Sequence, residues 1–274
     1  MIRRPSPLPR RYRILSNAVQ APLFGLATIG FGSLSIASSF LDREGRLQHR
    51  IARIWAKTTM GVSLSPVTVI GEENLRRASV AVYACNHTSY MDTPVLFSSL
   101  PFQFRILAKQ QLWKVPFIGW HLNRSGQIPV DSTTQRSSIT SLSAGVRALK
   151  SGMPLVVFPE GGRTMTGHPQ AFLSGAAYLA LRAQVPLVPM ALVDVYGLLP
   201  IHTTQFHPRP VKLVVGEPIA TEGHTTRELD ALNKRLREEV CRLYYKHGGM
   251  PKPVAAPAEL PAAATQPTPL EPTR

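Results

Sequence analysis

The sequence predicts an α/β fold in which a central mixed sheet is flanked by helices and preceded by a membrane-embedded helical hairpin. From residue 66 onward, short apolar runs alternate with longer stretches of helical periodicity, which is typical of a sheet layered with helices. The run at 155–158, Leu-Val-Val-Phe, is apolar at every position, so it suits a central strand covered on both faces. Residues 14–41 carry no charged side chain, which makes them a candidate membrane segment.

The N-terminal segment is predicted to enter the membrane without crossing it. Five arginines lie within residues 1–13, and such a basic flank favours the cytoplasmic side. A single crossing would then place the rest of the chain outside the cytoplasm. Pro22 and Gly25 predict a break between two helices, the first at about residues 10–21 and only ~18 Å long, which reaches about one leaflet. A secretory signal sequence is the alternative interpretation.

Residues 43–58 are predicted to form a basic amphipathic helix. Such a helix, directly after an uncharged stretch, favours a position at the membrane surface. A helix packed on the domain with a solvated basic face is the alternative. The apolar stripe, at helical spacing, consists of Leu47, Ile51, Ile54, Trp55 and Thr58. The basic stripe consists of Arg43, Arg46, Arg50, Arg53 and Lys57.

The rest of the chain divides into predicted strands, helices and a tail. We assign 1–60 to a membrane-associating helical segment, 61–249 to the α/β domain and 250–274, with its seven prolines, to a disordered Pro/Ala-rich tail. Strands are expected at 66–70, 80–84, 104–108, 127–130, 154–158, 186–193 and 211–215. Helices are expected at 93–100, 134–151, 173–184 and 225–246.

The composition limits the kinds of partner that the protein is expected to bind. The formal net charge is +15, from 31 Lys+Arg and 16 Asp+Glu, which favours an anionic membrane surface, a phosphorylated substrate or nucleic acid. Much of this charge lies before residue 58, with no stacking-aromatic pattern of the kind that binds single strands, so nucleic acid is not expected. The chain has only two cysteines, Cys85 and Cys241, without metal-ligand spacing, and we expect neither a disulfide nor a metal site.

Residues 80–92 carry the first candidate site. An apolar run ends at Ala84, and the polar residues Asn86, His87, Ser89 and Asp92 follow it. Histidine is the usual general base near neutral pH, and a carboxylate can fix its tautomer and stabilise its charged form. His87 and Asp92 therefore form a candidate catalytic dyad. The alternative is that Asp92 caps the helix that Thr93-Pro94 opens, with His87 an ordinary loop residue.

Two further motifs offer groups that bind anions. After the strand at 154–158 come Glu160, Gly161 and Arg163. Glycine allows close backbone approach to a ligand, and the arginine fork suits phosphate, while Glu160 could orient Arg163 or bind a hydroxyl. A simple turn with a solvent-exposed arginine remains open. Lys109 ends another strand and is either a second phosphate contact or an exposed lysine. The apolar, aromatic residues 116–120 follow it.

Four blocks in a fixed order resemble the glycerolipid acyltransferase family, in particular its bacterial 1-acyl-sn-glycerol-3-phosphate (lysophosphatidic acid) acyltransferases. The resemblance covers about residues 66–220. The blocks are Asn86-His87-x-Ser89-x-x-Asp92, Lys109-x-x-Leu112, Phe158-Pro159-Glu160-Gly161-x-Arg163 and Val185-Pro186-Leu187-Val188-Pro189. The chain departs from the family pattern at Gln111, at Gly162 and at Ser132, where Glu, Thr and Arg are usual. These residues lie where the specificity for phosphate and glycerol would be set.

The resemblance implies acyl transfer from acyl-CoA or acyl-acyl-carrier protein to the free sn-2 hydroxyl of 1-acyl-glycerol 3-phosphate, which gives phosphatidic acid. His87 and Asp92 would be catalytic, and Glu160, Gly161, Arg163 and Lys109 would bind phosphate and glycerol. No cofactor is implied beyond the acyl co-substrate. The expected location is the cytoplasmic face of the cell inner membrane.

Other acceptors and other classes stay open on sequence alone. The acceptor could be a lyso-ornithine lipid, another lysophospholipid or glycerol 3-phosphate. A hydrolase with Cys85 and His87 as a nucleophilic pair is a rival, although no Gly-x-Ser-x-Gly elbow is present. A membrane binder without catalysis is a second rival.

Overall fold

The computed structural model describes residues 9–251 except 43, 116, 132, 133, 202 and 249. Its centre is a 7-stranded sheet in the order β1-β7-β6-β2-β5-β3-β4. The strands from β6 to β4 run parallel, and β7 pairs antiparallel with β6 and parallel with β1. The mixed sheet is therefore confirmed. The strands are β1 Val67–Ile70, β2 Val82–Cys85, β3 Arg105–Lys109, β4 Ile128–Val130, β5 Leu155–Val157, β6 Leu187–Val193 and β7 Val211–Val215.

The predicted strands and helices of the α/β domain are confirmed within a few residues. A short helix α4, a 3-10 turn η2 and the helix α6 were not predicted. The helices of this domain are α4 Glu72–Arg77, α5 Asp92–Ser99, η2 Gln110–Lys114, α6 Ile118–Arg124, α7 Gln135–Lys150, α8 Gly175–Ala183, η3 Thr226–Glu228 and α9 Leu229–Lys246. The boundaries assigned at 60/61 and 249/250 stay a prediction, and residues 252–274 of the predicted tail lie outside the described residues.

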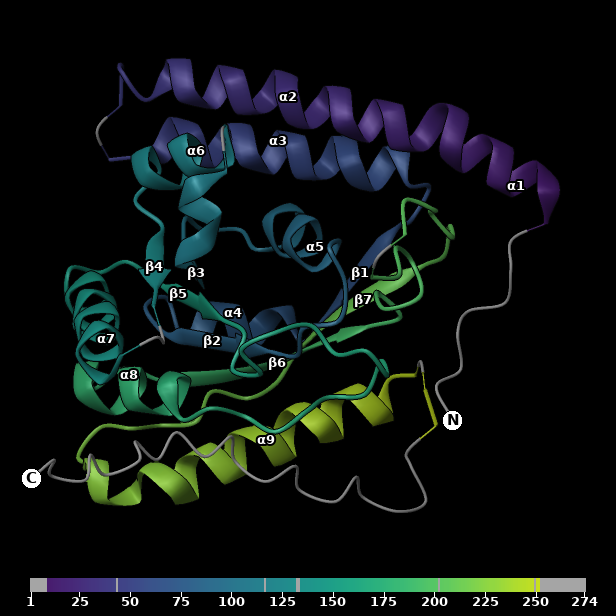
Figure 1. Ribbon diagram of the computed structural model, residues 1–274. Coiled ribbons are helices and arrows are strands. Elements are labelled where there is room, and N and C mark those ends of the chain that lie inside the picture. The colour runs from purple at the N-terminus through teal and green to yellow at the C-terminus, as the bar shows by residue number, and fades with distance from the viewer. Residues whose placement is uncertain are drawn as a thin grey trace, which may run out of the picture.

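Helices cover both faces of the sheet (Figure 1). In β2, Val82 and Ala84 pack with α7, α8 and α9 on one face, while Tyr83 and Cys85 pack with α5 and α3, Arg46–Val62, on the other. Every residue of β2 is buried, as expected for a strand with helices on both sides. This double cover explains why the central strands are uniformly apolar.

A helical hairpin is present at the N-terminus, but it is not the predicted one, because its second arm is the helix that was predicted separately at 43–58. No break occurs at Pro22–Gly25: α1 Arg10–Leu15, the π-helical η1 Ser16–Gln20 and α2 Ala21–Ser38 form one continuous rod. Pro22 sits in the first turn of α2, directly after the π-helical turn, where its missing N–H leaves little unsatisfied. The chain turns back only after Ser38, and α3 is the second arm.

The second arm lies inside the molecule rather than at its edge. α3 packs against α2 on one side and α5 on the other. Ile51 is buried and Trp55 half-buried, whereas Ile54 is 54% exposed, so the apolar stripe was only partly predicted. The basic face is confirmed at Arg46, Arg50 and Lys57, which are exposed; Arg43 lies outside the described residues. The alternative of a helix packed on the domain matches this arrangement.

Candidate functional site

Three neighbouring strands bring the predicted site residues to one edge of the sheet. The order β2-β5-β3 places His87 after β2, the segment 158–163 after β5 and Lys109 at the end of β3. These strands are parallel, so their carboxyl ends meet at the edge where open α/β sheets bind their ligands. Motifs that lie 22 to 76 residues apart in the sequence (109 − 87 = 22; 163 − 87 = 76) thus converge.

His87 and Asp92 form the predicted pair. The Nδ1 atom of His87 lies 2.7 Å from Oδ2 of Asp92. The Asp92 side chain is fully buried, while 12% of the His87 side chain reaches solvent. A neutral imidazole that donates from Nδ1 to a carboxylate keeps Nε2 as an acceptor. The pair therefore presents a proton-accepting nitrogen toward the accessible side.

Asp92 organises the whole turn rather than capping the helix from outside. Its Oδ2 accepts hydrogen bonds from the backbone N–H of Thr88 at 2.6 Å and of Ser89 at 2.9 Å, and Oδ1 accepts from the Thr88 hydroxyl. Met91 holds the N-cap position of α5, without a side-chain cap bond, and Asp92 is the first helical residue. The N-cap interpretation is therefore wrong, because this carboxylate points back over the turn that carries His87.

The imidazole of His87 is held from its face as well. The ring of Phe158 stacks on it with the two centroids 3.9 Å apart and an interplanar angle of 21°. Sequence reasoning gave Phe158 no role in the site, because its meeting with His87 depends on β5 lying beside β2. The stacking restricts ring rotation, so Nε2 keeps a defined direction.

Asn86 and Ser89 bond the turn that carries His87 to β6 and to the segment that follows β6. The Asn86 side chain donates to the Leu192 carbonyl at 3.0 Å and accepts from the Leu192 N–H at 2.7 Å. The Ser89 hydroxyl donates to the Leu199 carbonyl at 2.9 Å. Buried polar groups that are fully bonded fix local geometry, so these residues hold the turn that carries His87 and Asp92.

Glu160 contacts the backbone of His87. Its Oε1 accepts the His87 N–H at 3.1 Å, and its Oε2 accepts from the Gln170 amide at 3.3 Å. Burial raises the pKa of Glu160 to about 8, and the nearby charge of Asp92 contributes in the same direction. A carboxyl group in such a setting holds its proton near neutral pH. Its described contacts are therefore with the turn that carries His87 and with Gln170, and not with Arg163.

Arg163 reaches back across the site to the first motif. Its Nε donates to the Ser89 carbonyl at 3.1 Å, and its guanidinium lies 4.3 Å from the centre of the Tyr90 ring. Gly161 adopts the left-handed conformation with φ of 68°, which glycine accepts without strain. The chain can therefore turn sharply between Glu160 and Arg163 and bring both side chains to the dyad.

Lys109 lies beside the glycine pair. A Cβ atom added at Gly162 would stand 3.8 Å from Nζ of Lys109, so the lysine reaches over the turn that carries Arg163. Two cations thus lie at the segment 160–163, Arg163 within it and Lys109 beside it. Of the departures from the family pattern, Gln111 is exposed within η2, and Ser132 lies outside the described residues.

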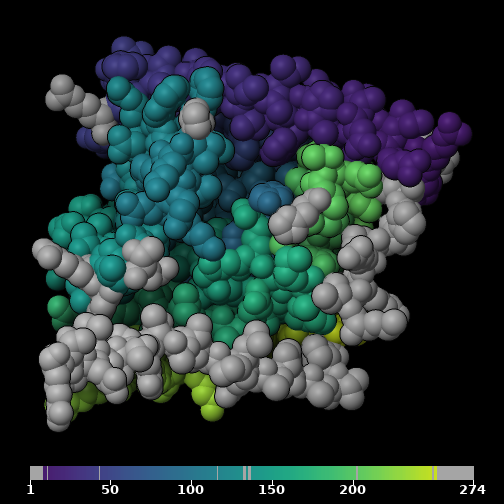
Figure 2. Space-filling view, in the orientation of Figure 1, coloured from purple at the N-terminus to yellow at the C-terminus, as the bar shows by residue number. Residues whose placement is uncertain are grey.

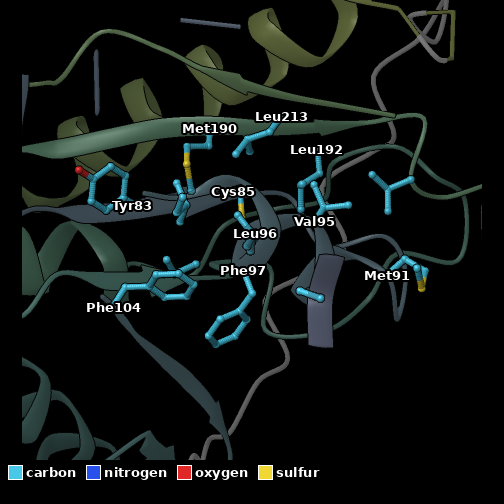
Figure 3. Packing of buried hydrophobic residues seen from close by; sticks show 14 of the residues in the cluster. Tyr83, Cys85, Met91, Val95, Leu96, Phe97, Phe104, Met190, Leu192 and Leu213 are labelled. Atoms are coloured by element: carbon cyan, nitrogen blue, oxygen red, sulfur yellow. The ribbon is translucent and has the colours of Figure 1, made fainter. Parts of the chain in front are cut away.

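Cys85 does not belong to this site. Its side chain is fully buried in the core between the sheet and α5, among residues that include Leu96 and Met190 (Figure 3). Burial, with the charge of Asp92 adding to it, raises the pKa of the Cys85 thiol. A buried, protonated thiol is a poor nucleophile, so the Cys85–His87 hydrolase hypothesis is wrong. Among the described residues no group of three or more His, Cys, Asp or Glu side chains gathers for a metal.

Comparisons with known proteins find acyltransferases. The acyltransferase family profile matches residues 66–193. A 1-acyl-sn-glycerol-3-phosphate acyltransferase of Chlamydomonas reinhardtii is 30% identical over 71% of this chain and 59% of its own. That of Saccharomyces cerevisiae is 29% identical over 81% and 75%. The crystal structure of the 1-acyl-sn-glycerophosphate (LPA) acyltransferase PlsC from Thermotoga maritima superimposes with a TM-score of 0.70 at 26% identity, covering 84% of this chain and 95% of that one.

The curated relatives are not all of the same length as this chain. The chain spans about half of the length of several of them: the matched regions cover 59%, 43% and 52% of the Chlamydomonas, Arabidopsis and Brassica proteins. The match to the Thermotoga structure is nearly complete on that side. The region matched by the family profile, residues 66–193, includes both His87 and the segment 158–163.

Proposed function

Since its domain at 66–193 makes this chain a member of the acyltransferase family, we propose that it transfers a fatty acyl group to the free sn-2 hydroxyl of 1-acyl-glycerol 3-phosphate and so forms phosphatidic acid. The observation that carries this proposal is the 2.7 Å contact between His87 and Asp92 at an accessible edge where Arg163 also lies. The relatives named for this reaction support the choice of acceptor.

His87 acts as the general base of the proposed reaction. Its Nε2 takes the proton of the acceptor hydroxyl while that oxygen attacks the thioester carbonyl. Asp92 accepts from Nδ1 and stabilises the imidazolium that forms. The carbon–sulfur bond then breaks, and the proton passes from His87 to the leaving thiolate. The donor is acyl-CoA or acyl-acyl-carrier protein, since both present a thioester.

Arg163 and Lys109 hold the phosphate of the acceptor. Arg163, after β5, bonds to the turn that carries the dyad, and Lys109, at the end of β3, lies beside Gly162. Arginine and lysine pair strongly with phosphate oxygens. Holding the headgroup there lets the neighbouring glycerol hydroxyl reach His87, and Gly161 and Glu160 shape the turn against which the glycerol rests.

The N-terminal rod seats this site at the cytoplasmic face of the inner membrane. The helix Tyr12–Ser38 is, among the described residues, long and apolar enough to cross a membrane. It is bonded to the domain near both ends: Ser16 bonds to the loop at 204–206, and Ser39, directly after the helix, accepts from Arg124. A helix held along the domain at both ends lies along the membrane plane and inserts into one leaflet.

The test is an acyl-transfer assay of the purified protein in detergent across several lysolipids. Lysophosphatidic acid, lyso-ornithine lipid, another lysophospholipid and glycerol 3-phosphate are offered with acyl-CoA and with acyl-acyl-carrier protein. His87→Ala is expected to lower turnover by about 10²-fold or more, because general base catalysis contributes 10²–10⁴ in rate. Preference for lysophosphatidic acid supports the acceptor.

A matched control exists in the same chain. His224 also contacts a carboxylate, Glu228, at 2.7 Å, but this pair is about half exposed and lies outside the site. His224→Ala should keep full turnover. Wild-type turnover in His87→Ala would refute the dyad, and inactivity of the wild type with every acceptor would refute acyl transfer.

A further inference from the structure

We propose that the segment from η2 to α6, residues 110–124, is a second membrane-binding element that contacts an anionic phospholipid bilayer beside the N-terminal rod. The segment exposes five large apolar side chains, each between 40% and 55% exposed. Soluble surfaces rarely gather apolar groups in this way unless they bind a partner or a membrane. The five are Leu112, Val115, Phe117, Ile118 and Trp120.

The backbone is built to present the aromatic pair. Phe117 adopts a positive φ of 62°, which is unusual for a bulky residue and marks a position with a specific role. Gly119 lets α6 approach η2, since a Cβ there would lie 2.2 Å from the Trp113 carbonyl oxygen. The rings of Phe117 and Trp120 lie 5.2 Å apart, so they form one exposed aromatic unit.

This surface is continuous with the end of the N-terminal rod. The Ser35 hydroxyl lies 2.8 Å from Nδ1 of His121, and Arg124 donates to the Ser39 hydroxyl at 3.0 Å. A hollow of about 370 Å³ between the two elements is lined by Ile36, Phe40, Trp120, Asn123 and Arg124. In the space-filling view the teal atoms of this segment lie directly against the purple rod (Figure 2).

The positive charge of this surface indicates that it binds a bilayer with anionic lipids. Residues 93–130 contain no Asp or Glu but include Arg105, Lys109, Lys114 and Arg124. The Arg124 guanidinium lies 4.1 Å from the centre of the Phe40 ring. Aromatic side chains mixed with cations are typical of the membrane interface, where the rings sit at headgroup level. A surface for an acidic protein would not need so many exposed aliphatic groups.

The inference rests on the proposed function and adds a route for the acceptor. Lys109, the proposed phosphate contact, directly precedes η2. A segment immersed at headgroup depth therefore brings this lysine to the level of lipid phosphates. The acceptor can pass from the bilayer to the dyad along the η2–α6 side without leaving the interface.

Tryptophan quenching tests the contact. The chain has three tryptophans, and the double variant Trp55→Phe, Trp113→Phe keeps only Trp120. A matched reporter carries Trp55→Phe, Trp113→Phe, Trp120→Phe and Ile139→Trp, because Ile139 on α7 is 55% exposed, as Trp120 is. Vesicles of phosphatidylglycerol and phosphatidylcholine with brominated chains should quench the first reporter and leave the second unchanged.

A second variant measures the contribution to binding. Phe117→Ser with Trp120→Ser should lower partitioning into these vesicles by about tenfold or more, because two large apolar side chains no longer leave water. Ile139→Ser should partition as the wild type does.

The outcomes separate the two proposals. Vesicle-bound protein with unquenched Trp120 would overturn this inference, as would a dimer that buries Trp120 without lipid. Absence of vesicle binding would overturn both this inference and the proposed position of the N-terminal rod in the membrane. Quenching of Trp120 in a protein that transfers no acyl group would support the inference and refute the proposed reaction alone.

Discussion

The Asp92 side chain contacts His87 and also accepts hydrogen bonds from the backbone of the turn. Different substitutions can distinguish these two roles. Its Oδ2 accepts from His87, Thr88 and Ser89. Asp92→Asn supplies one acceptor oxygen and replaces the other with a donor. We expect loss of turnover together with a stability loss of about 1–3 kcal/mol, because buried N–H groups lose their acceptor. Urea unfolding and the acyl-transfer assay measure the two effects.

His87→Gln is the comparison for Asp92→Asn. It removes the base but leaves the carboxylate to the two backbone N–H groups, so turnover should fall with a smaller change in the urea midpoint. Equal midpoints for Asp92→Asn and the wild type would show that the turn does not depend on the carboxylate.

The raised pKa of Glu160 predicts that the free energy of unfolding falls as pH rises. Its pKa is about 8 in the folded state against 4.5 for an unperturbed group. Between these values the folded state holds a proton that the unfolded state has lost, so stability is fully present below pH 4.5 and is lost as pH rises through 8. The effect is on the order of a few kcal/mol.

Glu160→Gln removes this titration. Relative to the variant, the wild type should lose stability between pH 5 and about 9, measured by urea unfolding at several pH values. Glu222→Gln, at an exposed position, should follow the wild-type curve. Parallel curves for wild type and Glu160→Gln would mean that Glu160 is ionised throughout.

At the level of residues, the sequence predicted which side chains meet but not how they connect. His87 and Asp92 lie five residues apart, so local spacing predicts their contact. The bonds from Glu160 to His87 and from Arg163 to Ser89 join residues 73 and 74 positions apart. They depend on β5 lying next to β2, and periodicity does not predict strand order.

Among the elements, α3 carries a buried histidine that should make the stability of the fold depend on acidic pH. His49 is buried between the rings of Phe97 and Phe104, at centroid distances of 5.2 and 5.0 Å. Burial, assisted by Arg53, lowers the pKa of His49 to about 4 from 6.5. As the pH decreases below 6.5, the unfolded state gains a proton that the folded state takes up only near pH 4. The free energy of unfolding therefore decreases as the pH decreases from 6.5 to 4.

His49→Phe should remove that acid sensitivity, because the new ring packs against the same neighbours and cannot titrate. Denaturant unfolding at pH 7 and pH 4.5 gives the measurement, with a difference on the order of a few kcal/mol. His224→Ala, at an exposed histidine, should leave the wild-type acid dependence in place. An unchanged dependence in His49→Phe would place the acid-sensitive group elsewhere.

The elements of the α/β domain could be predicted because burial on two faces makes its strands uniformly apolar. β6, for example, is buried at every residue from Leu187 to Val193. The N-terminal break could not be predicted correctly. Proline at 22 is a helix breaker in most settings, but here it occupies the first turn of α2 after a π-helical turn, which a local pattern does not reveal.

For the whole molecule, charge predicts how strongly the protein binds anionic membranes. Arg46, Arg50 and Lys57 are exposed on α3, and Arg227, Lys234 and Arg235 are exposed on η3 and α9, on the opposite side of the sheet (Figure 1). Changing the first three to Gln should weaken binding to phosphatidylglycerol vesicles by about tenfold to a hundredfold, because each cation near such a surface contributes about 1 kcal/mol.

Changing the second three to Gln removes the same charge and should have little effect. Sedimentation with vesicles at low and high salt gives both numbers, and the difference between the triple variants should shrink as salt screens the charges. Equal losses in the two triple variants would mean that net charge, rather than the α3 side of the molecule, determines binding.

The hairpin predicted within the uncharged stretch is wrong, because α1, η1 and α2 form one continuous rod. The uncharged stretch at 14–41 predicts membrane contact through composition alone, but its geometry is determined by partners far along the chain. Ser16 and Gln20 are buried, and they bond to Thr204, Phe206 and Val62. A window of local sequence contains none of these partners.

These partners also impose an order of events on the newborn chain. Ser16 bonds to the Thr204 carbonyl 188 residues away, so at 5–20 residues per second the rod waits roughly 10–40 s for its seat to be synthesised. During that time α3, which is synthesised directly after the rod, can already pack against it. The pair of α2 and α3 can therefore form before the loop that holds Ser16 exists.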